Sequence, residues 1–464
     1  MDLENKQALI YGAGKSGISA ARLLLKEGAV PTIFDGNTSL DVDAIREQVG
    51  ADIRILLGEM TAAYGEFDLL IMSPGISCEN PVFEEFSSRG LPIWGEVELA
   101  CRAGRGKILA VTGTNGKTTT VSLLGKILSD HLPEVYTVGN IGMPYTDVAM
   151  QQTDAAWTVA EVSSFQLETI EKFHPCACAI TNITEDHLNR HHTMEAYIAA
   201  KERIAENQTA EDFCVLNAED EALRDFAGRV ASHVVFFSSE RELEEGLFIK
   251  DGTIFLAEKT GASGEAASGA ERGLIPVVRT EELQILGKHN HENVMTAVAL
   301  AYYGAGLTIG QIRESVLAFS GVEHRIEFVE EIGGVRYYND SKGTNPDAAI
   351  QAIRAMDRPT LLIGGGYDKE SSYEEWIEAF DGKVKLFALI GQTREKIRDA
   401  AIACGFPEER IVLCEDLHEA VELCAGRAQS GDAVLLSPAC ASWGQFDNFE
   451  QRGDLFKEYV RERK

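Results

Sequence analysis

The residues with the clearest chemical meaning form a loop between an apolar run and a helix. Residues 113–120 read Gly-Thr-Asn-Gly-Lys-Thr-Thr-Thr and follow the apolar run 108–111. In a phosphate-binding loop (P-loop) of this type, backbone N–H groups surround the phosphates, the lysine contacts the β- and γ-phosphates, and a hydroxyl binds Mg²⁺. Val111 stands where such loops usually begin with glycine, so this one is a shortened variant. The sequence therefore predicts binding of a nucleoside triphosphate.

A second glycine-rich loop lies near the start of the chain. Residues 12–17 read Gly-Ala-Gly-Lys-Ser-Gly and follow the apolar run 8–11, and Asp35 ends the next β-type run. This is the dinucleotide fingerprint, in which the glycines admit a pyrophosphate at a helix N-terminus and the acid binds a ribose hydroxyl. The motif specifies a diphosphate joined to a ribose. A nicotinamide dinucleotide and a UDP-sugar both carry that group, so both remain open here.

Metal-type ligands follow two further apolar runs. Glu161 and His187 each come where a β-type run ends, and a cation that bridges phosphates accepts carboxylate oxygen and imidazole at this edge of a sheet. Each alone is typical of a polar loop; beside the phosphate loop they favour a metal site. Lys201, judged by its own segment, is a solvated lysine on a helix that Thr193 caps.

The last third of the chain repeats this arrangement. Polar segments follow three β-type runs, at residues 338–345, 364–369 and 437–442, and residues 446–453 follow the last of them. Because the carboxyl ends of parallel strands share one edge of a sheet, three such loops predict a substrate pocket.

The elements that must position these residues alternate between β-type and helical segments, which is typical of α/β domains with parallel sheets. We predict an N-terminal Rossmann-like domain at 1–97, a central P-loop domain at 98–321 and a C-terminal Rossmann-like domain at 322–464. Residues 239–282 differ in composition, and their small, polar stretch 261–269 is expected to be a mobile surface loop.

Composition limits the partners. The 464 residues carry a formal charge of −30, which repels nucleic acid and anionic membranes. The nine cysteines are scattered, which indicates a reducing compartment. The chain opens without a basic leader and has no apolar run of membrane-spanning length. We expect a monomeric cytoplasmic protein without membrane insertion.

Together these motifs resemble the Mur ligases, ATP-dependent enzymes of peptidoglycan precursor assembly, over essentially the whole chain. The segments that carry the resemblance are Gly113–Thr118, Glu161–Glu168, Thr181–His187, His289–Asn290 and Asn339–Asn345. The match is closest to the member that adds D-glutamate to UDP-N-acetylmuramoyl-L-alanine. The segments typical of that member are Ser73–Ile76, Leu436–Ser442 and Phe446–Gly453.

The resemblance implies a role for each matched position. The UDP-substrate positions are Gly14, Lys15, Ser16, Asp35, Gly75, Asn140, Ser163 and His187. The ATP positions are Gly113, Thr114, Asn115, Gly116, Lys117, Thr118, Thr119, Asn293, Arg325 and Asp340. The D-glutamate positions are Thr344, Lys369, Ser442 and Phe449.

The resemblance also implies catalytic groups and cofactors. The catalytic positions are Lys117, Lys201, His187 and Lys342. The cofactors are ATP and Mg²⁺, expected as two ions, and the metal positions are Thr118, Glu161, His187 and Lys201. Lys201 counts as a ligand because the family carries a carbamylated lysine there, which replaces the surface-lysine interpretation. Gly36 departs from the family pattern, in which a hydroxyl residue often follows the acid, so one uracil contact is in question.

The expected reaction is transfer of the ATP γ-phosphoryl group to the L-alanyl carboxylate, followed by attack of the D-glutamate amine and release of phosphate. Three alternatives remain. Another Mur ligase is one, although no Asp-Asn-Pro-Arg segment of the diaminopimelate- or lysine-adding members is present. An NAD oxidoreductase is the second, and a nucleotide-binding switch without ligase activity is the third.

Overall fold

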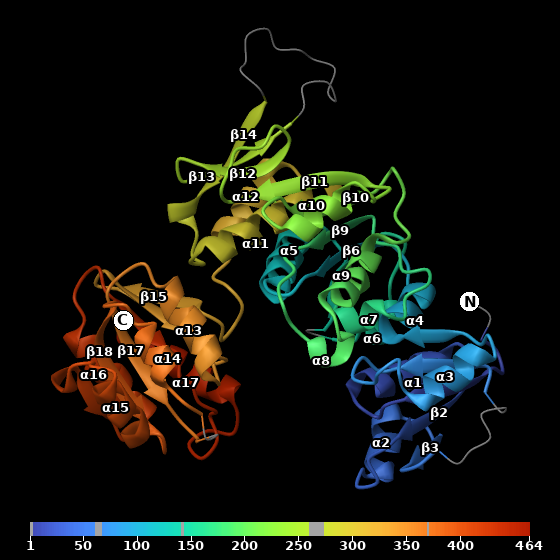
Figure 1. The fold of residues 1–464 in the computed structure, drawn as a ribbon, viewed down its shortest axis with the longest axis horizontal. Coiled ribbons are helices and arrows are strands. Elements are labelled where there is room, and N and C mark those ends of the chain that lie inside the picture. Colours follow the sequence, from blue (N-terminus) through green and yellow to red (C-terminus); the bar gives the residue numbers. More distant parts are fainter. Residues whose placement is uncertain (1–2, 61–66, 141–142, 259–272, 369–370) are drawn as a thin grey trace. The chain divides into compact units, whose positions relative to one another are not determined.

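The computed structural model describes residues 3–60, 67–140, 143–258, 273–368 and 371–464. The chain forms two compact units (Figure 1). One comprises Met1–Thr280 and Glu292–Val316, and the other comprises Glu281–His291 and Leu317–Lys464. Across the described ranges, no helix combines the length and apolarity that crossing a membrane requires.

The first sheet has five parallel strands in the order β3-β2-β1-β4-β5. The strands are β1 (Gln7–Tyr11), β2 (Val30–Asp35), β3 (Arg54–Leu57), β4 (Leu69–Met72) and β5 (Ile93–Gly95). The helices are α1 (Lys15–Lys26), α2 (Val42–Val49), α3 (Pro81–Ser88) and α4 (Glu96–Ala103). The strand order reverses between β1 and β4, and such a switch point is where α/β sheets bind ligands. The loops after these two strands contain the glycine motif and Gly75.

The middle sheet has nine strands in the order β14-β13-β12-β11-β10-β9-β6-β8-β7. Its parallel part comprises β6 (Lys107–Thr112), β7 (Val135–Gly139), β8 (Trp157–Glu161), β9 (Ala177–Ile180), β10 (Phe213–Asn217), β11 (His233–Ser238) and β12 (Gly246–Lys250). The strands β13 (Thr253–Ala257) and β14 (Leu274–Arg279) extend it as antiparallel strands. The helices are α5 (Lys117–His131), α6 (Tyr145–Ala149), α7 (Ser164–Leu167), α8 (Leu188–His191), α9 (Met194–Glu202), α10 (Glu221–Ala227), α11 (Lys288–Ala299) and α12 (Ile309–Leu317).

The antiparallel extension was not predicted. It lies within the stretch whose composition differs, and the expected loop at 261–269 lies outside the described residues. The strands β12 and β13 are joined by the turn at Asp251 and Gly252, both of which have positive φ. This is the Asp-Gly signal of a two-residue hairpin. The hairpin signal was therefore present in the sequence.

The C-terminal sheet has six strands in the order β15-β16-β20-β17-β18-β19. The strands are β15 (Glu327–Ile332), β16 (Val335–Asn339), β17 (Thr360–Gly365), β18 (Val384–Ile390), β19 (Ile411–Leu413) and β20 (Ala433–Leu436). The helices are α13 (Pro346–Ala355), α14 (Glu374–Glu378), α15 (Arg394–Ala403), α16 (Leu417–Arg427) and α17 (Phe449–Arg461). The last strand, β20, pairs with both β16 and β17, so the polar loops after these three strands share one edge of the sheet.

The helix α4 joins the first two sheets. Its residue Leu99 belongs to the core of the first domain, whereas Val97 and Ala100 belong to the core of the middle domain. The buried carboxylate of Glu98 accepts hydrogen bonds from the backbone N–H groups of residues 171–173, including that of Phe173 at 2.9 Å. The α/β class and three-domain architecture predicted from the sequence are confirmed.

Candidate active site

The phosphate loop connects β6 to α5, and its two glycines are required by close packing. Gly116 has φ of 85°, and a Cβ there would lie 2.2 Å from the Asn293 side-chain oxygen. A Cβ on Gly113, with φ of 145°, would lie 2.0 Å from the Thr181 hydroxyl. The Asn293 oxygen accepts a hydrogen bond from the Thr120 hydroxyl at 3.3 Å. The loop therefore leads directly into the N-terminus of α5, where N–H groups favour an anion.

Two predicted lysines meet at this loop. Lys117 Nζ donates to the carbonyl oxygens of Gly113 at 2.9 Å and Thr114 at 2.8 Å, and Lys201 Nζ donates to the same Gly113 oxygen at 2.7 Å. Lys201 lies over the Tyr197 ring and is only 2% exposed. Burial, with a smaller contribution from Lys117, lowers the pKa of Lys201 to about 7. The solvated-lysine interpretation of its segment is wrong, because the Lys201 side chain is buried against the phosphate loop.

Glu161 ends β8 beside the phosphate loop, because β8 pairs with β6. Its side chain is buried, and one carboxylate oxygen accepts a hydrogen bond from the Asn140 amide at 3.1 Å. The other carboxylate oxygen is buried without a hydrogen-bond partner among the described residues. A desolvated, unpaired carboxylate oxygen is unfavourable in an apolar setting and is suited to a cation. Glu161 therefore fits the predicted metal site.

His187 and Ser163 lie on the segments that follow β9 and β8. His187 is exposed and has φ of 52°; its Nε2 is 3.4 Å from Asp186, and its ring packs against Phe165 with centroids 4.9 Å apart. Ser163 caps α7 by accepting the Gln166 N–H at 3.3 Å, and the Gln166 side chain accepts the Ser163 N–H in return. These contacts place His187 next to α7. Thr118 and Thr119 lie in the first turn of α5, whereas Asn115 is exposed.

The glycine motif of the first domain is closed by Asp35. One carboxylate oxygen of Asp35 accepts the Ala13 N–H at 2.9 Å, and the other accepts the Asn37 N–H at 2.9 Å. A Cβ on Gly12 would lie 2.5 Å from the Ser73 hydroxyl, so the motif packs on the loop that contains Gly75. Gly14, Lys15 and Gly75 are exposed, and Ser16 is half-buried. The predicted UDP positions of this domain thus lie on two adjoining loops.

In the other unit, Asp340 follows β16 and is 4% exposed. It accepts hydrogen bonds from the Ser437 hydroxyl at 2.7 Å and from the Ile326 N–H at 3.3 Å. Burial raises the pKa of Asp340 to about 7, against the opposing effect of these donors. Asp340 thereby joins the loop after β16 to the loop after β20. Arg325, next to Ile326, is exposed.

Arg452 is a structural residue of this site that the sequence did not reveal. It is fully buried, and its guanidinium donates to the Ser341 hydroxyl at 2.9 Å, the Ser341 carbonyl at 2.7 Å and the Cys440 carbonyl at 3.1 Å. Burial lowers the pKa of Arg452 to about 10. The motif at residues 446–453 contained this arginine, but nothing in its spacing showed that it would be buried. It holds the loops after β16 and β20 together.

Three of the predicted D-glutamate positions, Thr344, Ser442 and Phe449, lie after β16, after β20 and at the start of α17. The Lys342 ammonium lies 5.8 Å from the centre of the Phe449 ring, and the Phe449 carbonyl accepts the Ser341 hydroxyl at 2.7 Å. Thr344 is half-buried and Ser442 is buried. Lys369 lies outside the described residues. The contacts of Phe449 with Ser341 and Lys342 therefore join the start of α17 to the loop after β16.

Three family models match consecutive parts of the chain. They are the MurD-like N-terminal domain of Mur ligases at residues 6–95, the Mur ligase middle domain at 111–301 and the Mur ligase glutamate ligase domain at 324–440.

The chain is also similar to named relatives over almost its full length. It is 51% identical over 463 residues to the UDP-N-acetylmuramoylalanine–D-glutamate ligase of Lachnoclostridium phytofermentans and 48% identical over 462 residues to that of Lachnospira eligens. Each alignment covers 99% of both chains.

Solved structures agree on the fold. UDP-N-acetylmuramate-alanine ligase MurC from Thermotoga maritima has a TM-score of 0.57 at 18% identity, covering 99% of this chain and 100% of that one. MurF from Acinetobacter baumannii has a TM-score of 0.58 at 15% identity, covering 98% and 93%. With the full-length relatives and the three consecutive domain matches, the chain belongs to the Mur ligase family, as a ligase of the MurD type.

Proposed function

We propose that this protein is an ATP-dependent ligase that adds D-glutamate to UDP-N-acetylmuramoyl-L-alanine in peptidoglycan precursor synthesis, acting as a cytoplasmic monomer. The relatives' names supply the substrates. The observation that carries the chemistry is the position of the Lys117 ammonium within the phosphate loop, where it donates to the Gly113 and Thr114 carbonyl oxygens. A ligase that phosphorylates a carboxylate needs positive charge where two anions must approach each other.

The first half of the reaction belongs to the middle domain. A carboxylate oxygen of the L-alanyl group attacks the γ-phosphorus of ATP, ADP leaves, and an acyl phosphate results. The phosphate positions are Gly113, Thr114, Asn115, Gly116, Lys117, Thr118 and Thr119, with Asn293 supporting the loop. Lys117 would exchange its two carbonyl contacts for phosphoryl oxygens, because a triphosphate oxygen is the stronger acceptor.

Divalent metal fits this site, since Glu161 offers an unpaired buried oxygen. We propose that Thr118, Glu161, His187 and Lys201 would hold two Mg²⁺ ions. When bound, Mg²⁺ neutralises phosphoryl charge and orients the triphosphate.

Lys201 would act as a ligand only after carbamylation. An amine reacts with carbon dioxide in its neutral form, and the lowered pKa of Lys201 makes that form abundant near neutral pH. The product is a carboxylate in place of an ammonium, which also removes the repulsion between Lys201 and Lys117. Labelled bicarbonate should give a carbamate carbon signal in the wild type and none in Lys201→Ala.

The UDP-sugar would bind across the first two domains. The proposed contacts are Gly14, Lys15, Ser16, Asp35, Gly75, Asn140, Ser163 and His187. Asp35 supports the glycine loop through two backbone N–H groups. Each carboxylate oxygen can accept a further bond from a ligand hydroxyl.

The second half of the reaction would use the C-terminal domain. The D-glutamate amine attacks the acyl carbon, phosphate leaves, and the amide forms with loss of a proton from the amine. The proposed D-glutamate contacts are Thr344, Lys369, Ser442 and Phe449, with Lys342 near the reacting phosphate and Arg325 and Asp340 at the nucleotide. We propose that these roles divide at the boundaries 1–97, 98–321 and 322–464.

The test is phosphate release from ATP with UDP-N-acetylmuramoyl-L-alanine and D-glutamate, L-glutamate, lysine or no amino acid. Turnover only with D-glutamate, with one new amide in the product, is the expected result. Turnover with lysine would move the chain to another member of the family. Turnover independent of any amino acid would refute the ligase proposal.

A further inference from the structure

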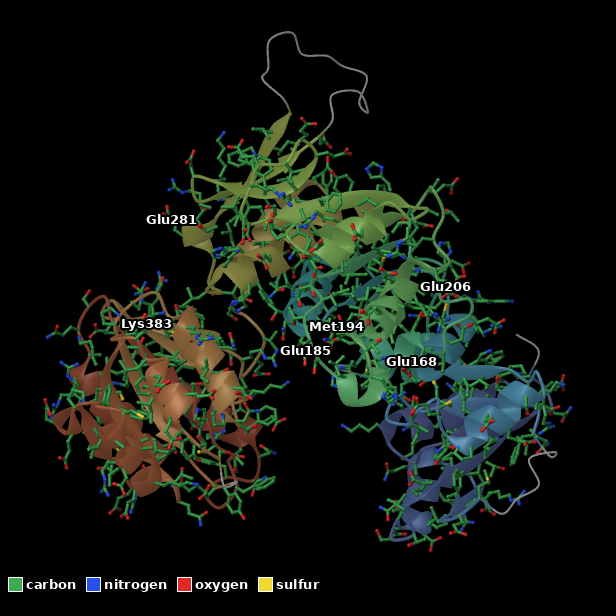
Figure 2. All side chains as sticks on the ribbon, in the orientation of Figure 1. Glu168, Glu185, Met194, Glu206, Glu281 and Lys383 are labelled. Carbon is green, nitrogen blue, oxygen red and sulfur yellow. The ribbon has the colours of Figure 1, made fainter. Side chains whose placement is uncertain are left out.

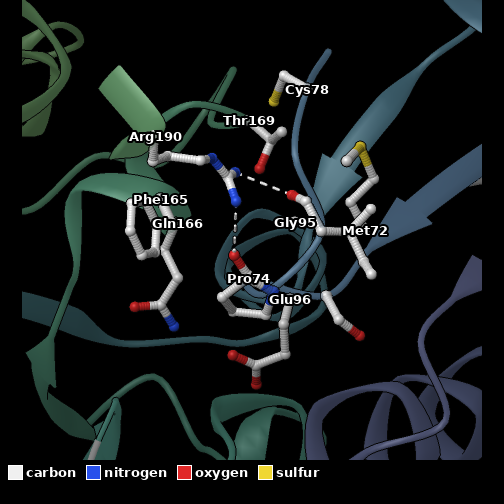
Figure 3. Close-up of a pocket in the computed structure, with 11 residues that line it drawn as sticks. Met72, Pro74, Cys78, Gly95, Glu96, Phe165, Gln166, Thr169 and Arg190 are labelled. Atoms are coloured by element: carbon white, nitrogen blue, oxygen red, sulfur yellow. Dashed lines mark hydrogen bonds between the residues drawn. The ribbon is translucent and has the colours of Figure 1, made fainter. Parts of the chain in front are cut away.

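A half-buried arginine connects the first domain to the middle domain at the two loops assigned to the UDP-sugar. Arg190 lies on α8, three residues after His187. Its guanidinium donates to the carbonyl oxygens of Ile76 at 2.8 Å and Pro74 at 3.5 Å, both on the loop that contains Gly75 (Figure 3). Its side chain is 13% exposed. The described contacts thus join the His187 segment to the Gly75 loop through one side chain.

The middle domain fixes the other side of this guanidinium. Arg190 pairs with the Glu168 carboxylate at 2.6 Å and lies over the Phe165 ring at 4.6 Å from its centre. Glu168 is labelled on the middle domain in Figure 2. The Phe165 ring also packs against His187. A planar group with donors on several edges can satisfy these directions together, which a lysine ammonium cannot do.

Neighbouring contacts connect the same two segments. The Cys78 thiol lies 3.5 Å from the Glu168 carboxylate, and His192 lies 2.9 Å from Glu79. Ser73, which lies on the Gly75 loop, packs against Gly12 of the glycine motif. A continuous set of contacts therefore runs from the diphosphate loop through the Gly75 loop to the segment of His187.

We infer that Arg190 is a positioning residue that fixes the Gly75 loop against the His187 segment, so that a UDP-sugar bound by the first domain presents its carboxylate at the phosphate loop. The inference rests on the proposed function for its kinetic consequences. Arg190 itself acts through the two loops it joins. Replacing Arg190 should weaken binding of the UDP-sugar and slow the chemical step, while nucleotide binding at the N-terminus of α5 stays unchanged.

Arg203 provides a matched control. It is also a half-buried arginine bonded to backbone carbonyls, those of Leu167, Glu168 and Ile170, and it pairs with Glu206. These partners all lie in the middle domain. Replacing Arg203 thus removes hydrogen bonds to backbone carbonyls at the end of α7, within the middle domain, without touching the Gly75 loop.

The kinetic experiment compares Arg190→Met, Arg190→Lys and Arg203→Met with the wild type. For Arg190→Met we expect KM for UDP-N-acetylmuramoyl-L-alanine to rise and kcat to fall, each by roughly ten- to a hundredfold, the factor for losing charge-assisted hydrogen bonds. The Kd for ADP should stay within about twofold. The kinetic constants of Arg190→Lys should lie between those of the wild type and Arg190→Met. Arg203→Met should lower the thermal midpoint and keep kinetic constants near the wild type. A parallel loss of ADP affinity, or normal kinetics in Arg190→Met, would overturn the inference.

Amide hydrogen exchange supplies a readout independent of activity. Peptides covering residues 73–79 should exchange faster in both Arg190 variants and at the wild-type rate in Arg203→Met. Unchanged exchange in these peptides contradicts the inference even if the wild type shows no ligase activity. If Arg190→Met does not fold, Glu168→Gln replaces it, because it removes the charge that orients the guanidinium and keeps the side-chain shape. A ligase-active wild type with normal Arg190 variants would refute the inference alone.

Discussion

Lys201 in the middle domain and Asp340 in the C-terminal domain are both buried, at 2% and 4% exposed, and burial brings the pKa of each to about 7. They differ in what surrounds them. Lys201 has a carbonyl, an aromatic ring and a second ammonium, whereas Asp340 has a hydroxyl, a backbone N–H and two arginines at longer range.

The difference shows two ways to keep a charged residue inside an α/β domain. Asp340 accepts hydrogen bonds from the Ser437 hydroxyl and the Ile326 N–H, so it can serve as a fixed link between two loops. Burial and, to a smaller extent, the neighbouring Lys117 ammonium disfavour the protonated form of Lys201. A lysine in that condition is suited to chemical modification, whereas the two hydrogen bonds of Asp340 keep its side chain in a fixed position.

The largest expected effect is a loss of activity on substituting Lys117, the lysine beside Lys201 in the phosphate loop. Lys117→Ala removes the ammonium that stabilises phosphoryl charge, so kcat should fall by roughly 100- to 1000-fold. The measurement is D-glutamate-dependent phosphate release. Lys126→Ala is the control, since Lys126 lies on the same helix α5 and pairs at the surface with Asp130. Activity of Lys117→Ala close to that of the control would remove Lys117 from the catalytic groups.

The pH dependence of stability tests the raised pKa of Asp340. Because the folded-state pKa of Asp340 is raised from 3.8 to about 7, the native state holds this proton more tightly than the unfolded state. The stabilisation that this tighter proton binding gives the native state is therefore fully present below pH 3.8. As pH rises towards 7 it is lost, which lowers the free energy of unfolding by at most roughly 4 kcal/mol. Urea unfolding of wild type and Asp340→Asn should differ by an amount that changes across this window. A pH-independent difference would show that burial does not raise the pKa.

Arg452→Met tests whether the loops after β16 and β20 depend on one buried cation. The substitution leaves two carbonyls and a buried hydroxyl without their donor, so the free energy of unfolding should fall by about 3 kcal/mol. Arg398→Met is the control, because Arg398 pairs with its exposed neighbour Asp399. Urea unfolding of both variants gives the comparison. Equal stability of the two variants would contradict the structural role of Arg452.

Substituting one glycine in the phosphate loop and one beside Asp340 compares the two regions again, with a smaller expected effect on stability. Gly116→Ala would place a Cβ 2.2 Å from the Asn293 oxygen at a left-handed φ, whereas Gly343→Ala would place one 2.4 Å from the Asp340 carboxylate without that backbone strain. We expect Gly116→Ala to destabilise by about 1–2 kcal/mol more than Gly343→Ala. Thermal unfolding measures this difference, and ADP titration should show weaker binding for Gly116→Ala. The opposite order would mean that the Asp340 loop is the more rigid of the two.

Much of the fold was predictable because apolar runs and glycine turns are local signals. The apolar runs 8–11 and 108–111 lie within the strands β1 (Gln7–Tyr11) and β6 (Lys107–Thr112). The capping of α9 by Thr193 was also predicted, and the Thr193 hydroxyl accepts the Ala196 N–H at 3.2 Å. Phosphate-loop and helix-cap residues carry their function in their own segment.

The remaining features depend on contacts between distant segments. Arg452 is buried and Arg190 half-buried only because loops from elsewhere in the chain close over them, and an isolated arginine in sequence is typical of the surface. The pKa of Lys201 likewise depends on burial by distant segments and on Lys117, which is far away in the sequence. The strands β13 and β14 were missed because the unusual composition around residues 259–272 obscured a short Asp-Gly hairpin signal.

The helix α4 couples the unfolding of the first two domains. Since Leu99 fills one core and Val97 and Ala100 fill the other, neither domain has a complete apolar interior without this helix. Removing it would also leave the N–H groups of residues 171–173 without the Glu98 carboxylate. The two domains should accordingly melt as one cooperative block, and neither should be exchangeable between relatives unless the helix and its receptors on both sides are transferred together.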